Sequence, residues 1–209
     1  MWRPSEISDW AHRLAEPVAR VVAKTGIAPN AVTITGFLLI IGVAWVLSQG
    51  HFLLGGFLVI VASSLDFIDG ALARVTGRST RFGALLDSTL DRYSEAVLLF
   101  GLLWFYAWQE QGGTTEMLLI FAIIVGSLLV SYVRARAEGL GLDAEVGIMR
   151  RTMRVLTLAL GLMLSPIGPA LLVILWILAI LTHLTAAYRL FYVWRCAKKE
   201  RPGPEDKLE

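Results

Sequence analysis

The sequence predicts an all-α membrane protein, with six transmembrane helices preceded by an N-terminal amphipathic juxtamembrane helix. Of its 209 residues, 56% are hydrophobic and only 17% are charged, and the mean hydropathy is +0.65. These values are too apolar for an ordinary water-soluble domain. Several stretches also reach the length of about 20 mostly apolar residues that a helix needs to cross a bilayer. We therefore expect an integral, multi-pass membrane protein.

Six apolar stretches are predicted to span the membrane. The fifth is short and is followed by Pro166 and Pro169, which interrupt a helix, so its limits are the least defined. An even number of spans places both ends of the chain on one side of the bilayer. The predicted spans are residues 31–49, 52–73, 82–108, 117–133, 152–164 and 170–194.

Positive charge is distributed unevenly along the chain. The connections after the first, third and fifth predicted spans contain no Lys or Arg, and all 19 basic residues lie elsewhere. They occur before the first span, in or beside the connections after the second and fourth spans, and at the end of the sixth span and beyond. Because Lys and Arg accumulate in cytoplasmic segments, we expect these regions and both termini to face the cytoplasm.

The segment before the first span has a helical apolar pattern. Residues 5–24 place Ile7, Trp10 and Leu14 at helical spacing, although Pro17 would bend such a helix. It either lies in the membrane interface or packs on the protein's own cytoplasmic face. We divide the chain into a cytoplasmic amphipathic segment, a six-helix transmembrane domain and a cytoplasmic tail. Their ranges are 1–28, 29–195 and 196–209.

Four carboxylates lie in the predicted spans or at their cytoplasmic edge. Asp66 and Asp69 come late in the second span, and Asp87 and Asp91 come early in the third. Burying one such group costs about 2.5 kcal/mol or more. Spacings of three and four residues put each pair on one face of its helix. A short connection would make the two helices antiparallel neighbours, so we expect the four carboxylates to converge near the cytoplasmic surface, where the site would lie.

Converging carboxylates repel one another unless cations neutralise them. Oxygen ligands without His or Cys favour Mg²⁺, Mn²⁺ or Ca²⁺, and two such ions would neutralise four carboxylates. Two other interpretations stay open on this pattern alone. The aspartates could pair with neighbouring arginines, or they could form the relay of a cation or proton transporter.

The residues between the two aspartate pairs follow the pattern D-x-x-D-G-x-x-A-R-x8-G-x-x-x-D-x-x-x-D over residues 66–91. This pattern resembles the signature of the CDP-alcohol phosphatidyltransferase family, with every defining position filled. The resemblance implies an enzyme that transfers a phosphatidyl group from a CDP-linked lipid to an alcohol and releases CMP. It implies that Asp66, Asp69 and Asp87 bind one metal ion and that Asp66, Asp87 and Asp91 bind a second. We expect Mg²⁺ at both positions, with Mn²⁺ as the second choice.

The family resemblance also assigns the general base and the donor contacts. Asp91 would deprotonate the acceptor hydroxyl for attack on the β-phosphorus. Gly70 and Ala73 would let a nucleotide approach closely, and Arg74 would bind its diphosphate. Residues 29–33 are similar to the family's Pro-Asn-x-x-Thr segment, although Asn30 could simply cap a helix. The predicted CDP-lipid contacts are Pro29, Asn30, Ala31, Val32, Thr33, Gly70, Ala73, Arg74, Thr80 and Gly83.

The acceptor alcohol depends on basic residues farther along the chain. Residues 131–138 and 147–154 are similar to stretches of phosphatidylinositol phosphate synthases, in which such basic residues bind the phosphate of inositol phosphate. The candidates here are Arg134, Arg151 and Arg189, with Arg154 as a substitute. Arg150 and the Thr152-Met153 pair depart from that pattern. Glycerol 3-phosphate, used by a phosphatidylglycerol phosphate synthase, therefore stays an alternative acceptor, and anchoring to anionic lipid stays an alternative role for the arginines.

The predicted partners follow from the same reasoning. They are a CDP-diacylglycerol-type lipid, a phosphorylated polyol and membrane lipid, with no nucleic acid. The family resemblance also implies a homodimer. Glu95 lies one turn beyond Asp91, and we expect it to be a hydrogen-bonded helix carboxylate because an unpartnered one is costly in a membrane.

Overall fold

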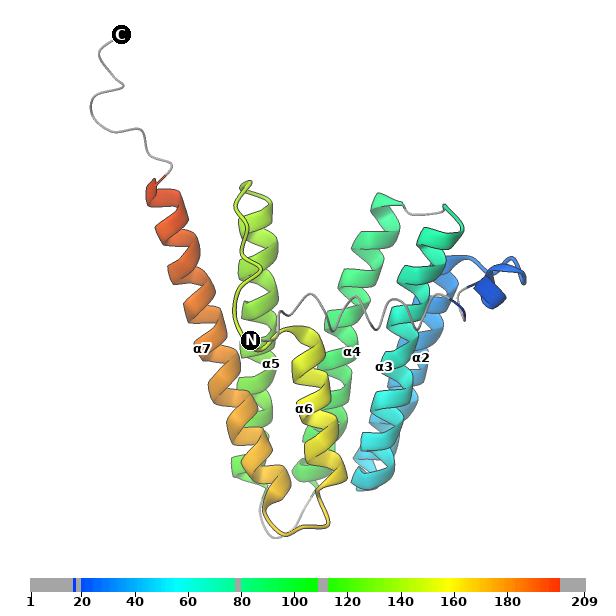
Figure 1. Ribbon diagram of the computed structural model, residues 1–209. Helices are drawn as coiled ribbons and strands as arrows, with labels where there is room; N and C mark the ends of the chain where they lie inside the picture. The colour runs from blue at the N-terminus through cyan, green and yellow to red at the C-terminus, as the bar shows by residue number, and fades with distance from the viewer. Residues whose placement is uncertain (1–16, 18–19, 78–79, 109–112, 200–209) are drawn as a thin grey trace.

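The computed structural model describes residues 17, 20–77, 80–108 and 113–199, without the side chains of Asp66, Phe67, Asp69 and Lys199. This part of the chain contains six helices of 13 to 30 residues (Figure 1). Each matches one predicted span, and α5 and α7 extend several residues past the predicted ends. The helices are α2 (Pro29–Ser48), α3 (Phe52–Val75), α4 (Arg81–Ala107), α5 (Thr114–Glu138), α6 (Arg151–Met163) and α7 (Ala170–Lys199).

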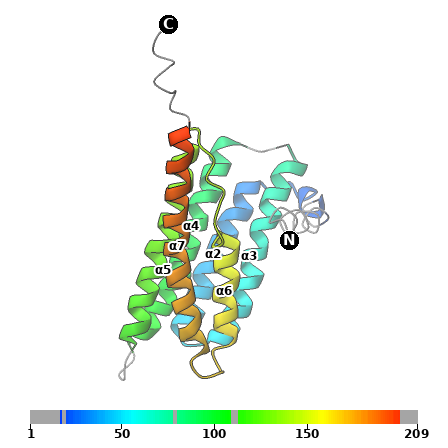
Figure 2. The same cartoon turned by 60° about the vertical axis from the view of Figure 1, so that its left-hand side comes forward.

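The helices alternate in direction along the chain. The C-terminal ends of α2, α4 and α6 lie at one end of the bundle, and those of α3, α5 and α7 lie at the other (Figures 1 and 2). The basic connections after α3 and α5 therefore share an end, as the charge pattern predicts. The predicted amphipathic helix falls mostly on residues 1–16 and 18–19, outside the described residues.

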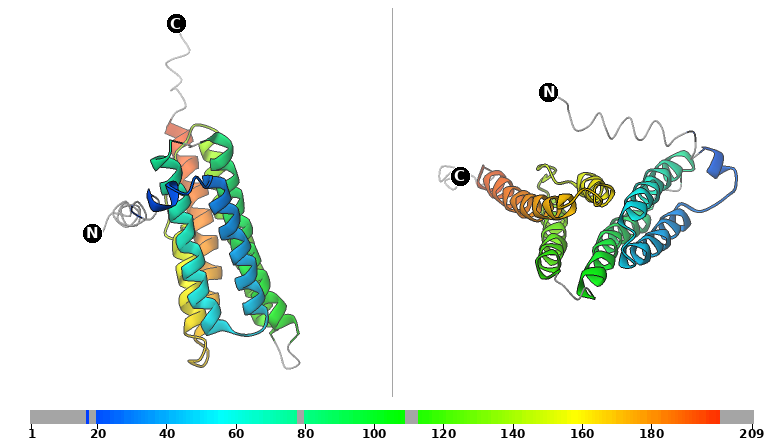
Figure 3. Two further views of the ribbon diagram at one scale, coloured as in Figure 1. Left: turned by 90° about the vertical axis from the view of Figure 1, so that its right-hand side faces the viewer. Right: turned by 90° about the horizontal axis from the view of Figure 1, so that it is seen from below.

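The helices pack in a closed ring. In order around the ring they are α2, α3, α6, α7, α5 and α4, with α4 returning to α2. The view along the bundle shows α2, α3 and α4 grouped on one side and α5, α6 and α7 on the other (Figure 3). Glycines allow the closest contacts, since a Cβ on Gly101 would lie 2.4 Å from the Ala44 carbonyl oxygen and one on Gly126 would lie 2.3 Å from Thr182 Oγ1.

Apolar side chains fill the inside of the bundle and also cover its outside. Leu47, Leu102 and Leu162 are fully buried in the main core. Trp45 is 67% exposed and Phe121 is 62% exposed. Large apolar side chains at such positions are expected where a helix faces lipid hydrocarbon rather than water.

Four of the described helices, α2, α3, α5 and α7, are long and apolar enough to cross a membrane. The other two differ for separate reasons. Three carboxylates, Asp87, Asp91 and Glu95, lie between the start and the middle turns of α4. Helix α6 has 13 residues and is only about 20 Å long at 1.5 Å per residue. The count of six spans therefore stays a prediction.

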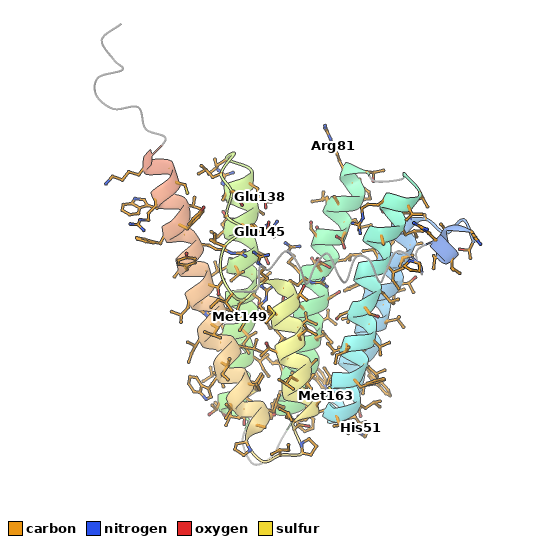
Figure 4. The ribbon with its side chains drawn as sticks, in the orientation of Figure 1. His51, Arg81, Glu138, Glu145, Met149 and Met163 are labelled. Atoms are coloured by element: carbon orange, nitrogen blue, oxygen red, sulfur yellow. The ribbon has the colours of Figure 1, made fainter. Side chains whose placement is uncertain are left out.

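The connection between α5 and α6 folds back along the bundle. It descends from Glu138 past Glu145 to Met149, so α6 begins well below the end of α5 (Figures 1 and 4). Within this connection Ala144 and Met149 are buried, and the Met149 amide donates to Thr185 Oγ1 at 3.4 Å. The first turn of α6 therefore lies partway along the bundle and not at its end.

Candidate active site

A cavity of about 200 Å³ opens between the start of α2, the end of α3 and the start of α4. Eight of the ten predicted CDP-lipid contacts line it. Of the other two, Ala31 is exposed and Val32 packs on Ala71 and Leu72. The residues lining the cavity are Pro29, Asn30, Thr33, Gly70, Ala73, Arg74, Thr80, Gly83, Ala84 and Asp87.

Local sequence features shape this cavity. Pro29 occupies the first turn of α2. Backbone N–H groups in that turn have no partner within the helix, so the missing N–H of proline costs no hydrogen bond there. Thr80 caps α4 by accepting a hydrogen bond from the Gly83 amide at 2.9 Å. A Cβ on Gly83 would lie 3.0 Å from both Asn30 Oδ1 and Thr80 Oγ1. Because Gly83 has no side chain, the start of α4 can approach Asn30 at the start of α2, and the cavity beside them stays open.

Helices α3 and α4 run antiparallel, as predicted, but they are not direct packing neighbours. Each packs chiefly on α2 instead. The space between these two antiparallel helices has a physical reason. Small and acidic residues, such as Gly70, Ala73 and Asp87, offer no large apolar surface to bury between the two helices, and the cavity occupies that space.

The structure describes the side chains of two of the four predicted metal ligands, Asp87 and Asp91. Asp66 and Asp69 lie on α3, but their side chains are outside the description. Asp87 lines the cavity. Asp91, one turn farther along α4, is 17% exposed, and its Oδ1 lies 2.9 Å from Arg151 Nη1. Its Oδ2 lies 3.9 Å from Arg92 Nη1.

These residues fit divalent metal ions by the chemistry of their donors. Asp87 and Asp91 present hard carboxylate oxygens from one face of α4. Among the described side chains, no three metal-ligating groups converge.

The predicted acceptor arginines lie on α5, α6 and α7. Arg134 Nε donates to Glu138 Oε1 at 2.7 Å, and its Nη1 lies 3.7 Å from Glu145 Oε1. Arg189 is buried, and it donates from Nε to the Val146 carbonyl at 2.7 Å and from Nη1 to the Val130 carbonyl at 2.8 Å. Arg189 thereby ties the α5–α6 connection to the two helices beside it.

Arg154 forms a buried ion pair with Glu95. Its Nε and Nη2 donate to the two oxygens of the Glu95 carboxylate, each at 2.6 Å. The side chains are 3% and 8% exposed. Removing one member of such a pair typically costs about 3–5 kcal/mol, because the other charge is left buried without compensation. The expectation that Glu95 is a hydrogen-bonded helix carboxylate is confirmed.

Two features that position the arginines were not predicted from the sequence. One is the α5–α6 connection, whose Glu145 lies between Arg134 and Arg150, at 3.3 Å from Arg150 Nη1. The other is the partnership of Glu95 with Arg154. The signal for that pair was present, since each is a charge in an apolar stretch and such charges need partners. Nothing in the sequence, however, indicates which of several arginines lies opposite Glu95.

Comparison with known proteins decides the family. A model of the family described as CDP-alcohol phosphatidyltransferase matches residues 26–187. The chain belongs to this family. A phosphatidylinositol phosphate synthase of Mycobacterium marinum is 37% identical over 205 residues, covering 94% of this chain and 84% of the relative. An archaetidylinositol phosphate synthase of Pyrococcus horikoshii is 34% identical over 177 residues, covering 84% of this chain and 88% of the relative.

Solved structures agree with the family assignment. The Mycobacterium tuberculosis phosphatidylinositol phosphate synthase with CDP-DAG bound matches with a TM-score of 0.80 at 34% identity, covering 87% of this chain and 94% of that one. The same enzyme in complex with manganese and citrate also matches with a TM-score of 0.80, covering 86% and 88% of the two chains. The chain is thus an integral membrane phosphatidyltransferase with the fold of these enzymes.

Proposed function

We propose that the protein transfers the phosphatidyl group of CDP-diacylglycerol to inositol phosphate, releasing CMP and forming phosphatidylinositol phosphate. The observation that carries this proposal is the cavity between α2, α3 and α4. It gathers eight residues of the predicted CDP-lipid site beside Asp87. The relatives named for inositol phosphate chemistry, one bacterial and one archaeal, support inositol phosphate over glycerol 3-phosphate as the acceptor.

The donor would bind along the cavity walls. Gly70 and Gly83 would leave room for the nucleotide. A Cβ on Gly83 would lie 3.0 Å from Asn30 Oδ1 and Thr80 Oγ1, and one on Gly70 would lie 3.7 Å from Arg74 Nη1. Arg74 would bind the diphosphate through charge-assisted hydrogen bonds. Two divalent ions, Mg²⁺ before Mn²⁺, would be held by Asp66, Asp69, Asp87 and Asp91. When bound, they would polarise the phosphate oxygens and stabilise the leaving CMP.

Asp91 would act as the general base. It would take the proton of the acceptor hydroxyl as that oxygen bonds to the β-phosphorus, while the bond from this phosphorus to the CMP oxygen breaks. Arg134, Arg151 and Arg189 are the proposed ligands of the acceptor phosphate. The 2.9 Å contact of Arg151 with Asp91 supports this assignment, because a phosphate on Arg151 would hold the acceptor within reach of the base.

The arrangement in the membrane completes the proposal. We infer six spans, with both termini and the active site on the cytoplasmic side, since the basic connections share one end of the bundle. Helix α6 would cross the bilayer only together with the connection that descends from Glu138 to Met149 before it. The cytoplasmic segment 1–28, the domain 29–195 and the tail 196–209 stay as predicted divisions. A homodimer also stays a prediction.

The test is CMP release from CDP-diacylglycerol vesicles by the purified protein. Inositol phosphate, glycerol 3-phosphate, free inositol and water would be compared as acceptors in the presence of Mg²⁺. The proposal requires rapid CMP release with inositol phosphate and slow release with the others. Faster turnover with glycerol 3-phosphate would show that glycerol 3-phosphate is the acceptor. No CMP release with any acceptor would overturn the proposed reaction.

A further inference from the structure

Helices α4 and α6 face each other across the ring without packing extensively on one another. Helix α4 packs chiefly on α2 and α5, and α6 packs chiefly on α3 and α7. Two ion pairs nevertheless cross from α6 to α4. Arg151 meets Asp91 at 2.9 Å, and Arg154 meets Glu95 at 2.6 Å.

The two ion pairs lie one helical turn apart on both helices. Glu95 follows Asp91 by four residues on α4, and Arg154 follows Arg151 by three on α6, so each set shares a helix face. The pairs differ in burial. Arg151 and Asp91 are 28% and 17% exposed, whereas Arg154 and Glu95 are almost completely enclosed. The outer pair therefore borders the site, and the inner pair lies beneath it.

Every nitrogen of Arg154 already donates to the protein, and the side chain is only 3% exposed, so a substrate has little access to it. Nε and Nη2 of Arg154 both bind Glu95, and Nη1 donates to the Met149 carbonyl at 2.9 Å. Met149 immediately precedes Arg150, the N-cap residue of α6. A single guanidinium thus fixes the first turn of α6, the chain that leads into it, and the facing turn of α4.

The geometry of this contact restricts movement more than a single ion pair would. A guanidinium that meets both oxygens of a carboxylate is held in plane and in position along the helix axis. Because the backbones of α4 and α6 pack chiefly on other helices, this ion pair is a direct link between the two helices one turn from Arg151 and Asp91.

We infer that Glu95 and Arg154 are positioning residues that hold α6 so that Arg151 reaches Asp91, and that Arg154 does not itself bind the acceptor phosphate. This inference rests on the proposed function, in which Arg151 binds that phosphate and Asp91 is the base. It replaces the sequence-based interpretation of Arg154 as a substitute phosphate ligand. The pair affects the kcat/KM for the acceptor. It does not line the donor cavity and leaves that cavity unchanged.

The principal test is the double variant Glu95→Leu with Arg154→Met. Replacing both charges by apolar side chains of similar size avoids an unpaired buried charge and is often neutral or stabilising. We expect normal thermal stability in detergent, a donor KM within about twofold of wild type, and a fall of about tenfold or more in kcat/KM for the acceptor. Unchanged acceptor kcat/KM in this folded variant would overturn the inference.

Two further variants separate positioning from stability. Leu158→Ala opens a cavity in the same helix at a buried apolar position, and it should lower the thermal midpoint while leaving the acceptor KM near wild type. Arg154→Lys keeps the charge but loses the two-oxygen contact, and it should raise the acceptor KM even if the double variant does not fold. An acceptor KM that rises equally in Leu158→Ala would assign the effect to stability and overturn the inference.

A distance measurement makes the inference independent of turnover. Nitroxide labels at Tyr93 on α4 and Leu156 on α6, both exposed, would be compared in a Cys196→Ser background by pulsed electron resonance. We expect one narrow distance distribution in the parent and in Leu158→Ala, and a broadened or shifted one in the double variant. An unchanged distribution would overturn the positioning role. Failure of the parent protein to release CMP would overturn only the proposed function, and this distance would still decide the positioning role.

Discussion

Nη1 of Arg151 lies 2.9 Å from Oδ1 of Asp91, so the first turn of α6 touches the carboxylate that closes the family signature. The two residues are 60 positions apart in the sequence and come from helices that are not packing neighbours. This contact joins the proposed donor side of the site, on α2, α3 and α4, to the proposed acceptor side on α5, α6 and α7. Four predictions test the two sides separately.

The first prediction concerns the acceptor side. Arg151→Gln should raise the acceptor KM by roughly 10- to 100-fold, because a hydrogen bond to a charged group contributes about 1.5–3 kcal/mol. The donor KM should change little, since Arg151 does not line the donor cavity. Steady-state CMP release with each substrate varied in turn measures both values.

Arg136→Gln is the matched control for Arg151→Gln. Arg136 is exposed near the end of α5, and its loss should leave both KM values near wild type. An acceptor KM unchanged in Arg151→Gln, or raised equally in Arg136→Gln, would contradict the role of Arg151.

The second prediction concerns the proposed base. Asp91→Asn keeps the size of the side chain but removes its ability to accept a proton, so kcat should fall by about 10²- to 10⁴-fold. Asp143→Asn, at an exposed position of the α5–α6 connection, makes the same change away from the site and should keep wild-type kcat. Normal turnover in folded Asp91→Asn would remove Asp91 from the mechanism.

The third prediction concerns the space for the nucleotide. Gly83→Ala places a methyl group 3.0 Å from Asn30 Oδ1 and Thr80 Oγ1, at the wall of the cavity. We expect the donor KM to rise by at least about tenfold, as for one extra methylene in a binding pocket, with the acceptor KM unchanged.

Gly42→Ala controls for adding a methyl group to a helical glycine. A Cβ at Gly42 meets nothing within 4 Å, and alanine favours the helix over glycine by roughly 0.5–1 kcal/mol. Its donor KM should match wild type and its thermal midpoint should not fall. Equal donor KM values in Gly83→Ala and Gly42→Ala would show that the cavity does not receive the donor.

The fourth prediction concerns metal dependence. Chelation by EDTA should abolish CMP release, and Mg²⁺ or Mn²⁺ should restore it, because four carboxylates are proposed to hold the ions. Electron resonance titration with Mn²⁺ should give two bound ions per chain, and fewer in Asp66→Ala. Full activity after exhaustive chelation would exclude the proposed ligand role of the aspartates.

The sequence predicted the helices, and eight of the residues that it groups as a donor site line one cavity, for reasons that are local. Apolar stretches of bilayer length identify α2, α3, α5 and α7, and the signature residues sit on short segments whose spacing largely fixes their positions. Thr80 and Gly83, for example, are brought together by the N-terminal cap of α4.

The acceptor side was harder to predict because it depends on contacts between distant residues. Arginine side chains are long and can reach several partners, so sequence position did not show that Arg154 binds Glu95 while Arg151 binds Asp91. The sequence also did not indicate the cavity between α3 and α4. Sequence spacing indicates which residues share a helix face, but it does not show that a third helix, α2, takes the contact.

The most direct test of the proposed reaction is to follow the oxygen of the acceptor hydroxyl. Inositol phosphate labelled with ¹⁸O at that hydroxyl would be incubated with CDP-diacylglycerol, Mg²⁺ and the protein, and the products analysed by mass spectrometry. Attack on the β-phosphorus predicts that the lipid product retains the label and that CMP carries none. Label found in a cytidine product, or a lipid product without label, would contradict phosphatidyl transfer by this route.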